Sequence, residues 1–230
     1  MRRLTVGFDL DMTLIDSRPG IAACYRALTE QTGVYVDAEL AVSRLGPPLR
    51  QEIAEWFPPD DIESAVATFR ELYPAHAIAG SPVLPGAASA VAAVRALGGR
   101  VIVVTSKIAR LARLHLAHVG LTADEVVGER FADGKTAALA EHDVAIYVGD
   151  HTADVRAARA AAAVAVGVAT GPCTVDELTA AGAGVVLTDL TGFAGWLAQN
   201  RRRFGLGRPA SVTSLGGRAT GALPEGHGRG

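Results

Sequence analysis

The chain has 230 residues, of which 49% are apolar and 20% charged, and its formal net charge is −2. This balance predicts a globular enzyme of one or two domains, with no nucleic-acid partner. No apolar run reaches the roughly 18 residues of a membrane span, and an acid at position 9 argues against a signal peptide. The two cysteines, Cys24 and Cys173, indicate no disulfide framework, so we expect a cytoplasmic protein with no membrane partner.

The first predicted element is a buried strand over residues 4–8, and three acids follow it directly. Asp9, Asp11 and Asp16 lie within "FDLDMTLIDS". In an extended chain, side chains two residues apart share a face, so Asp9 and Asp11 point the same way. Like charges this close are unfavourable unless a cation or a shared proton compensates. Asp16 is expected to lie at a hinge where the next segment begins.

Residues 18–82 have helical patterns and no convincing strand, although a crossover between parallel strands needs far fewer residues. Pro19 suits a first helical turn, and Gly33 suits a helix end. We therefore predict a helical cap over residues 18–82, inserted into an α/β core made of 1–17 and 83–199. Arg44 and Arg50, beside the rigid turn "LGPPLR", are candidates for contacting an acidic substrate.

The rest of the core alternates short apolar runs with helical patterns, which predicts a doubly wound parallel sheet of Rossmann-like type. Val-rich runs suited to buried parallel strands cover 101–105, 145–149 and 163–169, with weaker candidates at 126–129 and 184–187. Helices are expected over 86–98, 107–119, 134–142, 152–162, 174–181 and 190–199.

The last residues differ from the rest in composition. From Arg201 onward there are six arginines, one acid and eight glycines. We predict a disordered, basic, glycine-rich tail over 200–230. A solvated tail is favoured over a nucleic-acid or membrane-surface role.

Polar side chains follow several of the predicted strands, at the point where each strand ends. They are Asp9 and Asp11 after the first strand, Thr105 and Ser106 after the next, and Asp150 after 145–149, with Lys135 near a helix start. Ligands of open α/β sheets bind beyond the carboxyl ends of the strands. We therefore expect these groups to converge at one edge of one sheet.

The acids of this set predict a magnesium site. Asp150 and Asp154 are four residues apart, which is the spacing of one helical face. Together with Asp9 and Asp11 they offer hard oxygen ligands with few His or Cys nearby, which favours Mg²⁺ over zinc. For Asp150 alone, capping of the following helix is the alternative.

The remaining groups suit a phosphate. Thr105 and Ser106 can offer hydroxyl and backbone N–H groups to an anion, although both are also ordinary helix caps. Lys135 opposes the dipole at a helix start, a conflict that an anionic ligand or a nearby carboxylate would remove. Lys107, the other of the chain's two lysines, is the second candidate for this role, although an exposed position at a helix start is favoured for it. Acids with Mg²⁺, hydroxyls and a lysine, without a Ser–His pair, predict phosphoryl transfer.

Four segments together resemble the haloacid dehalogenase-like hydrolase superfamily. "FDLDMTLIDS" resembles its Asp-x-Asp-x-Thr motif, and "VIVVTSK" resembles its apolar strand that ends in Thr or Ser. Lys135 falls where the third motif has its lysine, and "YVGDHTADVRAARAA" is similar to the fourth motif, a Gly-Asp followed by another Asp. Order and spacing agree over residues 4–199. The helical insertion, "LGPPL" and "LPGAASAVAAVRALGGRV" resemble the phosphoglycolate phosphatase-like branch.

The resemblance implies a role for each matching residue. Asp9 would be the nucleophile and a Mg²⁺ ligand, and Asp11 the acid and base, with its backbone carbonyl on the metal. Asp150 would complete the metal site, with Asp154 as a ligand through water or as a support. Thr13 would support the turn. Thr105, Ser106 and Lys135 would hold the phosphate.

The chain also departs from the family pattern, and other members of the fold remain alternatives. Met12 replaces the glycine most often found there, and Thr136 replaces a common proline after the lysine. Dehalogenases generally lack the second acid, and sugar phosphomutases usually carry a histidine in the first cap helix, which 18–32 lacks. A regulatory or binding member without catalysis is the third alternative.

We predict a Mg²⁺-dependent phosphatase of a small phosphorylated metabolite. His151 is expected to line the site mouth without binding the metal. The sequence names neither the substrate nor the oligomeric state.

Overall fold

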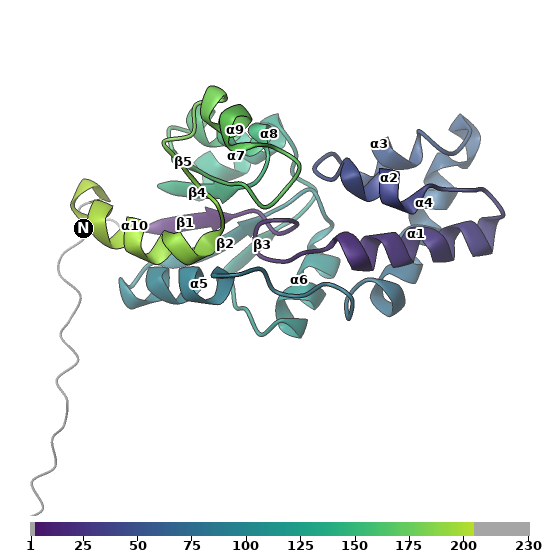
Figure 1. Cartoon of the computed structure of the whole chain (residues 1–230), viewed down its shortest axis with the longest axis horizontal. Coiled ribbons are helices and arrows are strands. Elements are labelled where there is room, and N and C mark those ends of the chain that lie inside the picture. Colours follow the sequence, from purple (N-terminus) through teal and green to yellow (C-terminus); the bar gives the residue numbers. More distant parts are fainter. Residues whose placement is uncertain (1–2, 205–230) are drawn as a thin grey trace, which may run out of the picture.

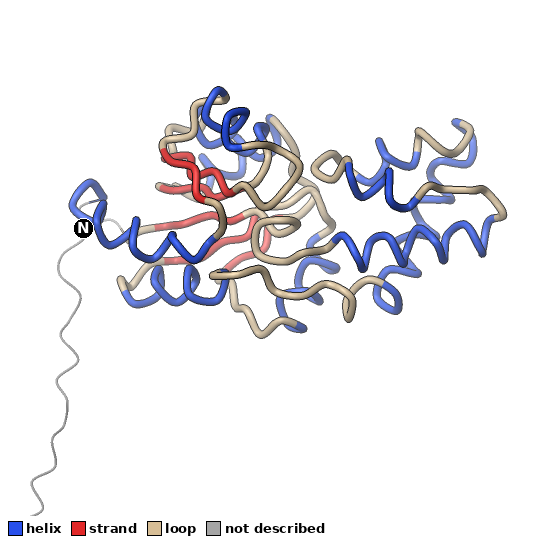
Figure 2. Tube along the Cα trace, viewed as in Figure 1, coloured by secondary structure: helices blue, strands red, loops and turns tan. Residues whose placement is uncertain are grey.

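The core of the molecule is a six-stranded parallel sheet. The computed structural model describes residues 3–204. The strands lie in the order β3-β2-β1-β4-β5-β6, and every neighbouring pair is parallel. Figure 2 shows them as one red layer between blue helices. Their bounds are β1 Thr5–Phe8, β2 Arg100–Val104, β3 Glu125–Val127, β4 Ile146–Gly149, β5 Val164–Val168 and β6 Val185–Leu187. The predicted doubly wound sheet is confirmed, including both weaker strands.

Helices cover both faces of the sheet (Figure 1). One face packs against α5 (Ala87–Ala96), α6 (Ala109–His118) and α10 (Phe193–Asn200). The other packs against α7 (Asp133–Glu141), α8 (Thr152–Ala160) and α9 (Val175–Ala180). Because both faces are covered, the central strands are buried along their whole length, which explains their continuous apolar runs.

The register aligns the carboxyl ends of the central strands. Phe8 of β1 pairs with Val103 of β2 and with Val148 of β4. The loops that follow these three strands therefore begin at nearly the same level. This is the edge at which the sequence predicted the polar side chains to converge.

The cap is a separate group of helices between β1 and α5. It consists of α1 (Arg18–Thr32), α2 (Ala38–Ser43), α3 (Leu49–Ile53), α4 (Ile62–His76) and a short 3-10 helix, Pro59–Asp61. These helices share their own apolar core, distinct from the two layers beside the sheet (Figure 1). Local signals explain two ends: Asp37 caps α2 by accepting the Leu40 N–H, and Gly33 ends α1 with φ 74°.

Two chain segments connect the cap with the core, and they run side by side. The backbone N–H of Asp16 donates to the carbonyl of Pro82 at 2.9 Å, and Ile15 forms a bridge with Val83. The Asp16 carboxylate also holds the Arg18 guanidinium at the start of α1. The division at residues 17/18 and 82/83 stays a prediction.

The ordered chain extends further than the predicted boundary at residue 200. Residues Arg201–Phe204 form a 3-10 helix, and the Phe204 ring lies 6.3 Å from that of Trp196. The prediction of a tail otherwise falls on residues 205–230, outside those described. Among residues 3–204, no helix combines the length and apolar character needed to cross a membrane.

Candidate active site

Asp9 lies at the first position after β1 and is largely buried. Its Oδ1 accepts the backbone N–H of Leu10 at 2.8 Å, and its Oδ2 lies 2.9 Å from the Lys135 ammonium. Burial raises the pKa of Asp9 to about 7, although the attraction of Lys135 opposes the shift. The strand end therefore holds a carboxylate whose negative charge is incompletely compensated.

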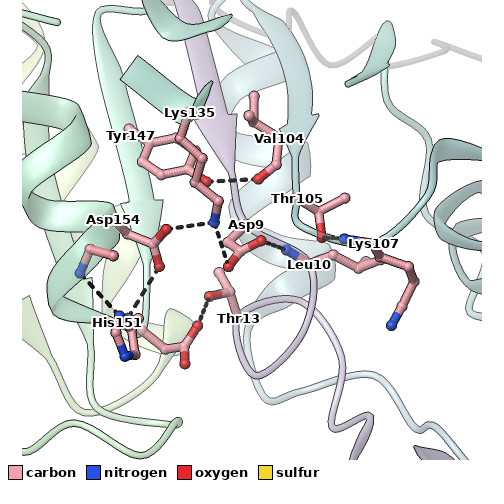
Figure 3. Close-up of polar contacts among 12 residues, drawn as sticks. Asp9, Leu10, Thr13, Val104, Thr105, Lys107, Lys135, Tyr147, His151 and Asp154 are labelled. Carbon is pink, nitrogen blue, oxygen red and sulfur yellow. Dashed lines mark hydrogen bonds and ion pairs between the residues drawn. The ribbon is translucent and has the colours of Figure 1, made fainter. Parts of the chain in front are cut away.

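Two acids from the loop after β4 join Asp9. Carboxylate oxygens of Asp9, Asp150 and Asp154 lie within 4.8 Å of one another, and all three residues are buried. Lys135, on α7, reaches Asp154 Oδ1 at 2.6 Å as well as Asp9 (Figure 3). The lysine thus bridges two of the three acids, which removes the conflict between its charge and the helix start.

Asp150 does not cap the helix that follows it, so the capping alternative is wrong. His151 is the capping residue of α8, and its Nδ1 accepts the N–H of Ala153 at 3.0 Å. Asp150 Oδ1 instead accepts the Thr13 hydroxyl at 2.9 Å. Asp150 is free to face the other acids, whereas His151 uses Nδ1 within its own helix start.

The donor set fits a divalent cation. With all three carboxyls ionised, the cluster and the one buried lysine have a formal charge of −2. Burial, together with the negative charges of Asp154 and Asp9, raises the pKa of Asp150 well above its ordinary value, although the Thr13 hydrogen bond and Lys135 oppose the shift. All the donors are oxygens, which Mg²⁺ prefers to nitrogen and sulfur.

Asp11 lies apart from this cluster and pairs with Lys107. The Lys107 ammonium is 2.9 Å from Asp11 Oδ1, and the lysine side chain is only 9% exposed. It also lies 4.8 Å from the centre of the Tyr73 ring, on cap helix α4. The expectation that Lys107 is exposed at a helix start is wrong, because the cap covers it and Asp11 neutralises it.

Met12 adopts the left-handed backbone conformation, which explains why glycine is common at this position. Its φ is 58°, and its N–H donates to the Ile15 carbonyl in a tight loop. The Met12 carbonyl accepts the Thr170 hydroxyl at 2.5 Å. The side chain is almost fully buried and reaches the cavity described next.

A cavity of about 140 Å³ separates these acids from the cap. Its core end is formed by Asp9, Asp11, Met12, Ser106, Lys107 and Asp150. Thr105 is completely buried, and its hydroxyl accepts the N–H of Lys107 at 3.2 Å. Of the two predicted hydroxyl groups, only that of Ser106 belongs to a cavity-lining residue.

A family model described as haloacid dehalogenase-like hydrolase matches residues 6–164. The chain belongs to the haloacid dehalogenase-like hydrolase family. Members of this family are generally hydrolases and phosphatases. The predicted resemblance is therefore confirmed.

Curated relatives of this family member include the "Tyrosine-protein kinase PtkA" of Mycobacterium tuberculosis (strain ATCC 25618 / H37Rv). It is 30% identical over 167 residues, a match that covers 66% of this chain and 57% of the relative. The same protein name is given to a relative from Mycobacterium bovis with equal identity and coverage. The chain thus spans just over half the length of the curated relatives it matches.

Solved structures similar to this chain share its fold. The haloacid dehalogenase-like protein SP0104 from Streptococcus pneumoniae has a TM-score of 0.73 and 22% identity, covering 85% of this chain and 98% of its own. A protein described as a predicted phosphatase from Clostridium acetobutylicum has a TM-score of 0.72 and 24% identity, covering 86% and 100%. One described as a predicted phosphoglycolate phosphatase from Haemophilus somnus 129PT has a TM-score of 0.72 and 19% identity, covering 85% and 98%.

The structure of this family member brings most of the predicted site residues to one sheet edge. Asp9, Asp150, Asp154 and Lys135 form one buried cluster, and Asp11 and Ser106 face the same cavity. Sequence reasoning placed Lys107 only second to Lys135 as a site lysine and favoured an exposed position for it. A signal was available, because the chain has only two lysines and Lys107 directly follows the predicted Thr105–Ser106 strand end.

Proposed function

We propose that this protein is a Mg²⁺-dependent phosphatase that acts on a small phosphorylated metabolite through a phosphorylated Asp9. One observation carries the proposal: a buried cluster of three carboxylates and Lys135, with a formal charge of −2, opens onto a cavity that Asp11 also lines. A divalent cation would balance this charge and allow an anionic phosphate to approach. Membership of a family of hydrolases and phosphatases supports it.

In the first step, a carboxylate oxygen of Asp9 attacks phosphorus. A bond between that oxygen and phosphorus forms while the phosphorus–oxygen bond to the leaving group breaks. Asp11 donates a proton to the departing oxygen. Mg²⁺ held by Asp9, Asp150 and Asp154 would offset the charge of the phosphate oxygens.

In the second step, Asp11 acts as a base. It takes a proton from a water molecule, whose oxygen attacks phosphorus, and the bond to Asp9 breaks as inorganic phosphate leaves. Although burial opposes it, the ion pair with Lys107 keeps the pKa of Asp11 below its ordinary value. The resting carboxylate is thus already a base, and proton donation in the first step requires Asp11 to leave Lys107 and first take up a proton from solvent. The incoming phosphate would then replace Asp11 as the anionic partner of the Lys107 ammonium group.

Two further residues would position the reacting groups. Lys135 fixes Asp9 and Asp154 by ion pairs of 2.9 and 2.6 Å, and it is itself buried. Ser106 would offer its hydroxyl to the phosphate at the core end of the cavity.

The proposal is tested by phosphate release from a panel of esters, with and without Mg²⁺. The panel includes p-nitrophenyl phosphate, phosphoglycolate, sugar phosphates, nucleotides and pyrophosphate. Asp9→Asn and Asp11→Asn should each reduce steady-state turnover at least a thousandfold, while Asp16→Asn in the same segment should retain it. Wild-type-like rates in either of the first two variants would contradict the mechanism.

Other activities of the fold give different results in the same assays. A sugar phosphomutase would isomerise a sugar phosphate, a dehalogenase would release halide, and a binding member would hydrolyse no ester. Because the curated relatives are named tyrosine-protein kinases, phosphoryl transfer to tyrosine is a separate activity to measure. Labelling of a tyrosine peptide from a nucleotide, without hydrolysis of any ester, would replace the phosphatase proposal.

A further inference from the structure

The cavity beside the acids has room for one small ring. Its volume is about 140 Å³, and it extends from Asp9 and Ser106 at the core end to the cap. An apolar cavity of about 150 Å³ is known to hold one benzene molecule. A phosphate ester with its phosphorus at Asp9 shares this volume with its leaving group, which is therefore limited to at most one small ring directed towards the cap.

The cap wall of this cavity is aromatic. Tyr25, Phe69 and Tyr73 all line it, and each is at most 3% exposed. The ring centres of Tyr25 and Phe69 are 4.7 Å apart, and those of Phe69 and Tyr73 are 5.6 Å apart. The rest of the apolar lining includes Ile21, Leu45, Leu49, Ile108 and Leu111. Aromatic walls of this kind favour a further ring in edge-to-face or offset contact.

The cations of the cap wall already have anionic partners. The pairs are Arg44 with Glu52 at 2.5 Å, Arg50 with Glu63 at 2.6 Å, and Arg70 with Glu129 at 3.3 Å. A substrate with a second acidic group would have to compete with these carboxylates. The lining therefore favours an uncharged leaving group over the acidic substrate that the sequence suggested for Arg44 and Arg50.

Met12 adds a polarisable contact at the other end of the cavity. Met12 lines the cavity next to Asp11, at a position where the family pattern usually has no side chain. Thioether sulfur makes favourable contacts with aromatic rings. The aromatic ring of a leaving group bound in this cavity would thus contact Met12 on one side and the aromatic cap wall on the other.

We propose that the preferred substrate is a phosphate monoester whose leaving group carries one uncharged aromatic ring, bound between Met12 and the wall formed by Tyr25, Phe69 and Tyr73. The assignment of the phosphoryl end rests on the proposed function. The ring site itself rests on the volume, the lining and the paired arginines.

Binding measurements test the ring site without requiring turnover. Benzylphosphonate and methylphosphonate share one head group, and their affinities for the Mg²⁺-loaded protein can be compared by calorimetry. We expect benzylphosphonate to bind at least tenfold more tightly. Leu45→Trp, which adds bulk to the cavity wall, should remove this preference, whereas Leu40→Trp on the exposed face of α2 should retain it.

Turnover measurements separate the ring site from the phosphatase proposal. Benzyl phosphate and phosphoglycolate both release an alcohol, so differences in leaving-group reactivity are small. We expect kcat/KM for benzyl phosphate to be at least tenfold higher. Tighter benzylphosphonate binding without hydrolysis of any ester would support the ring site and contradict the phosphatase. Equal or absent binding of the two phosphonates would overturn the ring site, whatever the turnover.

Discussion

The ammonium group of Lys107 lies 2.9 Å from Oδ1 of Asp11, and both side chains are largely buried between core and cap. Removing one member of a buried ion pair leaves an uncompensated charge, at a cost of about 3 kcal/mol or more. We expect Lys107→Met to lower the free energy of unfolding by about 3 kcal/mol. Adding Asp11→Asn to Lys107→Met should recover a large part of that loss.

Urea unfolding of the four proteins in this double-mutant cycle measures the coupling. We expect a coupling free energy above about 1 kcal/mol, because the two groups are in direct contact. Lys107→Arg keeps the charge and serves as the matched control. Strictly additive effects of the two substitutions would show that the pair does not hold the site together.

Met12 carries two opposing contributions to stability. Its left-handed φ of 58° costs roughly 1–2 kcal/mol, which glycine would avoid. Its buried side chain contributes roughly 2–5 kcal/mol. Met12→Gly should therefore lower the free energy of unfolding by about 1–3 kcal/mol.

The matched control for Met12 is Ala162, which also has a φ of 58° but is exposed. Ala162→Gly relieves strain without losing buried surface, so it should raise the free energy of unfolding by up to about 1 kcal/mol. Urea unfolding distinguishes the two. Equal stabilisation by both substitutions would mean that the Met12 side chain contributes nothing to packing.

His115 links the pH dependence of stability to the contact between core and cap. It is fully buried in α6, and its Nε2 lies 3.0 Å from the Tyr73 hydroxyl of α4. Burial and the nearby Lys107 charge lower the pKa of His115 from 6.5 to about 4.

Between those two pH values the unfolded chain binds the proton and the folded protein does not. The stabilisation from neutral His115 is thus complete above pH 6.5 and is lost as the pH falls towards 4. The loss amounts to about 3 kcal/mol. Relative to wild type, His115→Gln should flatten the dependence of the free energy of unfolding on pH in this window. His118→Gln, at an exposed position of the same helix, is the control, and parallel curves for wild type and His115→Gln would refute the assignment.

Metal binding should stabilise the protein through the acidic cluster. At a free Mg²⁺ concentration one hundred times the Kd, the free energy of unfolding should rise by about 2.7 kcal/mol. Asp150→Asn should remove this effect and raise the Tm of the metal-free protein, because it replaces a buried carboxyl whose ionisation is unfavourable beside Asp9 and Asp154. Thermal unfolding with Mg²⁺ and with a chelator measures both. Asp16→Asn should respond like wild type, and a full Mg²⁺ response in Asp150→Asn would place the metal elsewhere.

The fold was predictable because its signals are local. Continuous Val-rich runs such as 101–105 and the regular alternation with helical patterns identify buried parallel strands from sequence alone. The carboxyl ends of such strands share an edge, so Asp9 and Asp150 could be placed together without coordinates. The rule applies to Asp9 and Asp150 although they are 141 positions apart in the chain.

The environment of Lys107 was not predictable in the same way. Its burial depends on Tyr73, which the cap brings from 34 positions earlier in the chain. The capping role of Asp150 was equally ambiguous, because Asp150 and His151 both precede the helix and only the observed hydrogen bonds assign the cap. Contacts between cap and core follow from packing, which leaves no periodic pattern in the sequence.

The most direct test of the central claim is a search for a phosphoryl group on Asp9. Wild type, Asp9→Asn and Asp11→Asn would be mixed with Mg²⁺ and p-nitrophenyl phosphate, quenched in acid within milliseconds and analysed by peptide mass spectrometry. The p-nitrophenolate leaving group needs no proton, and without Asp11 no base activates water. We therefore predict that Asp11→Asn accumulates one phosphoryl group on Asp9 and that Asp9→Asn carries none. Phosphate release by wild type without modification of Asp9 in any sample, or modification at another residue, would contradict the account.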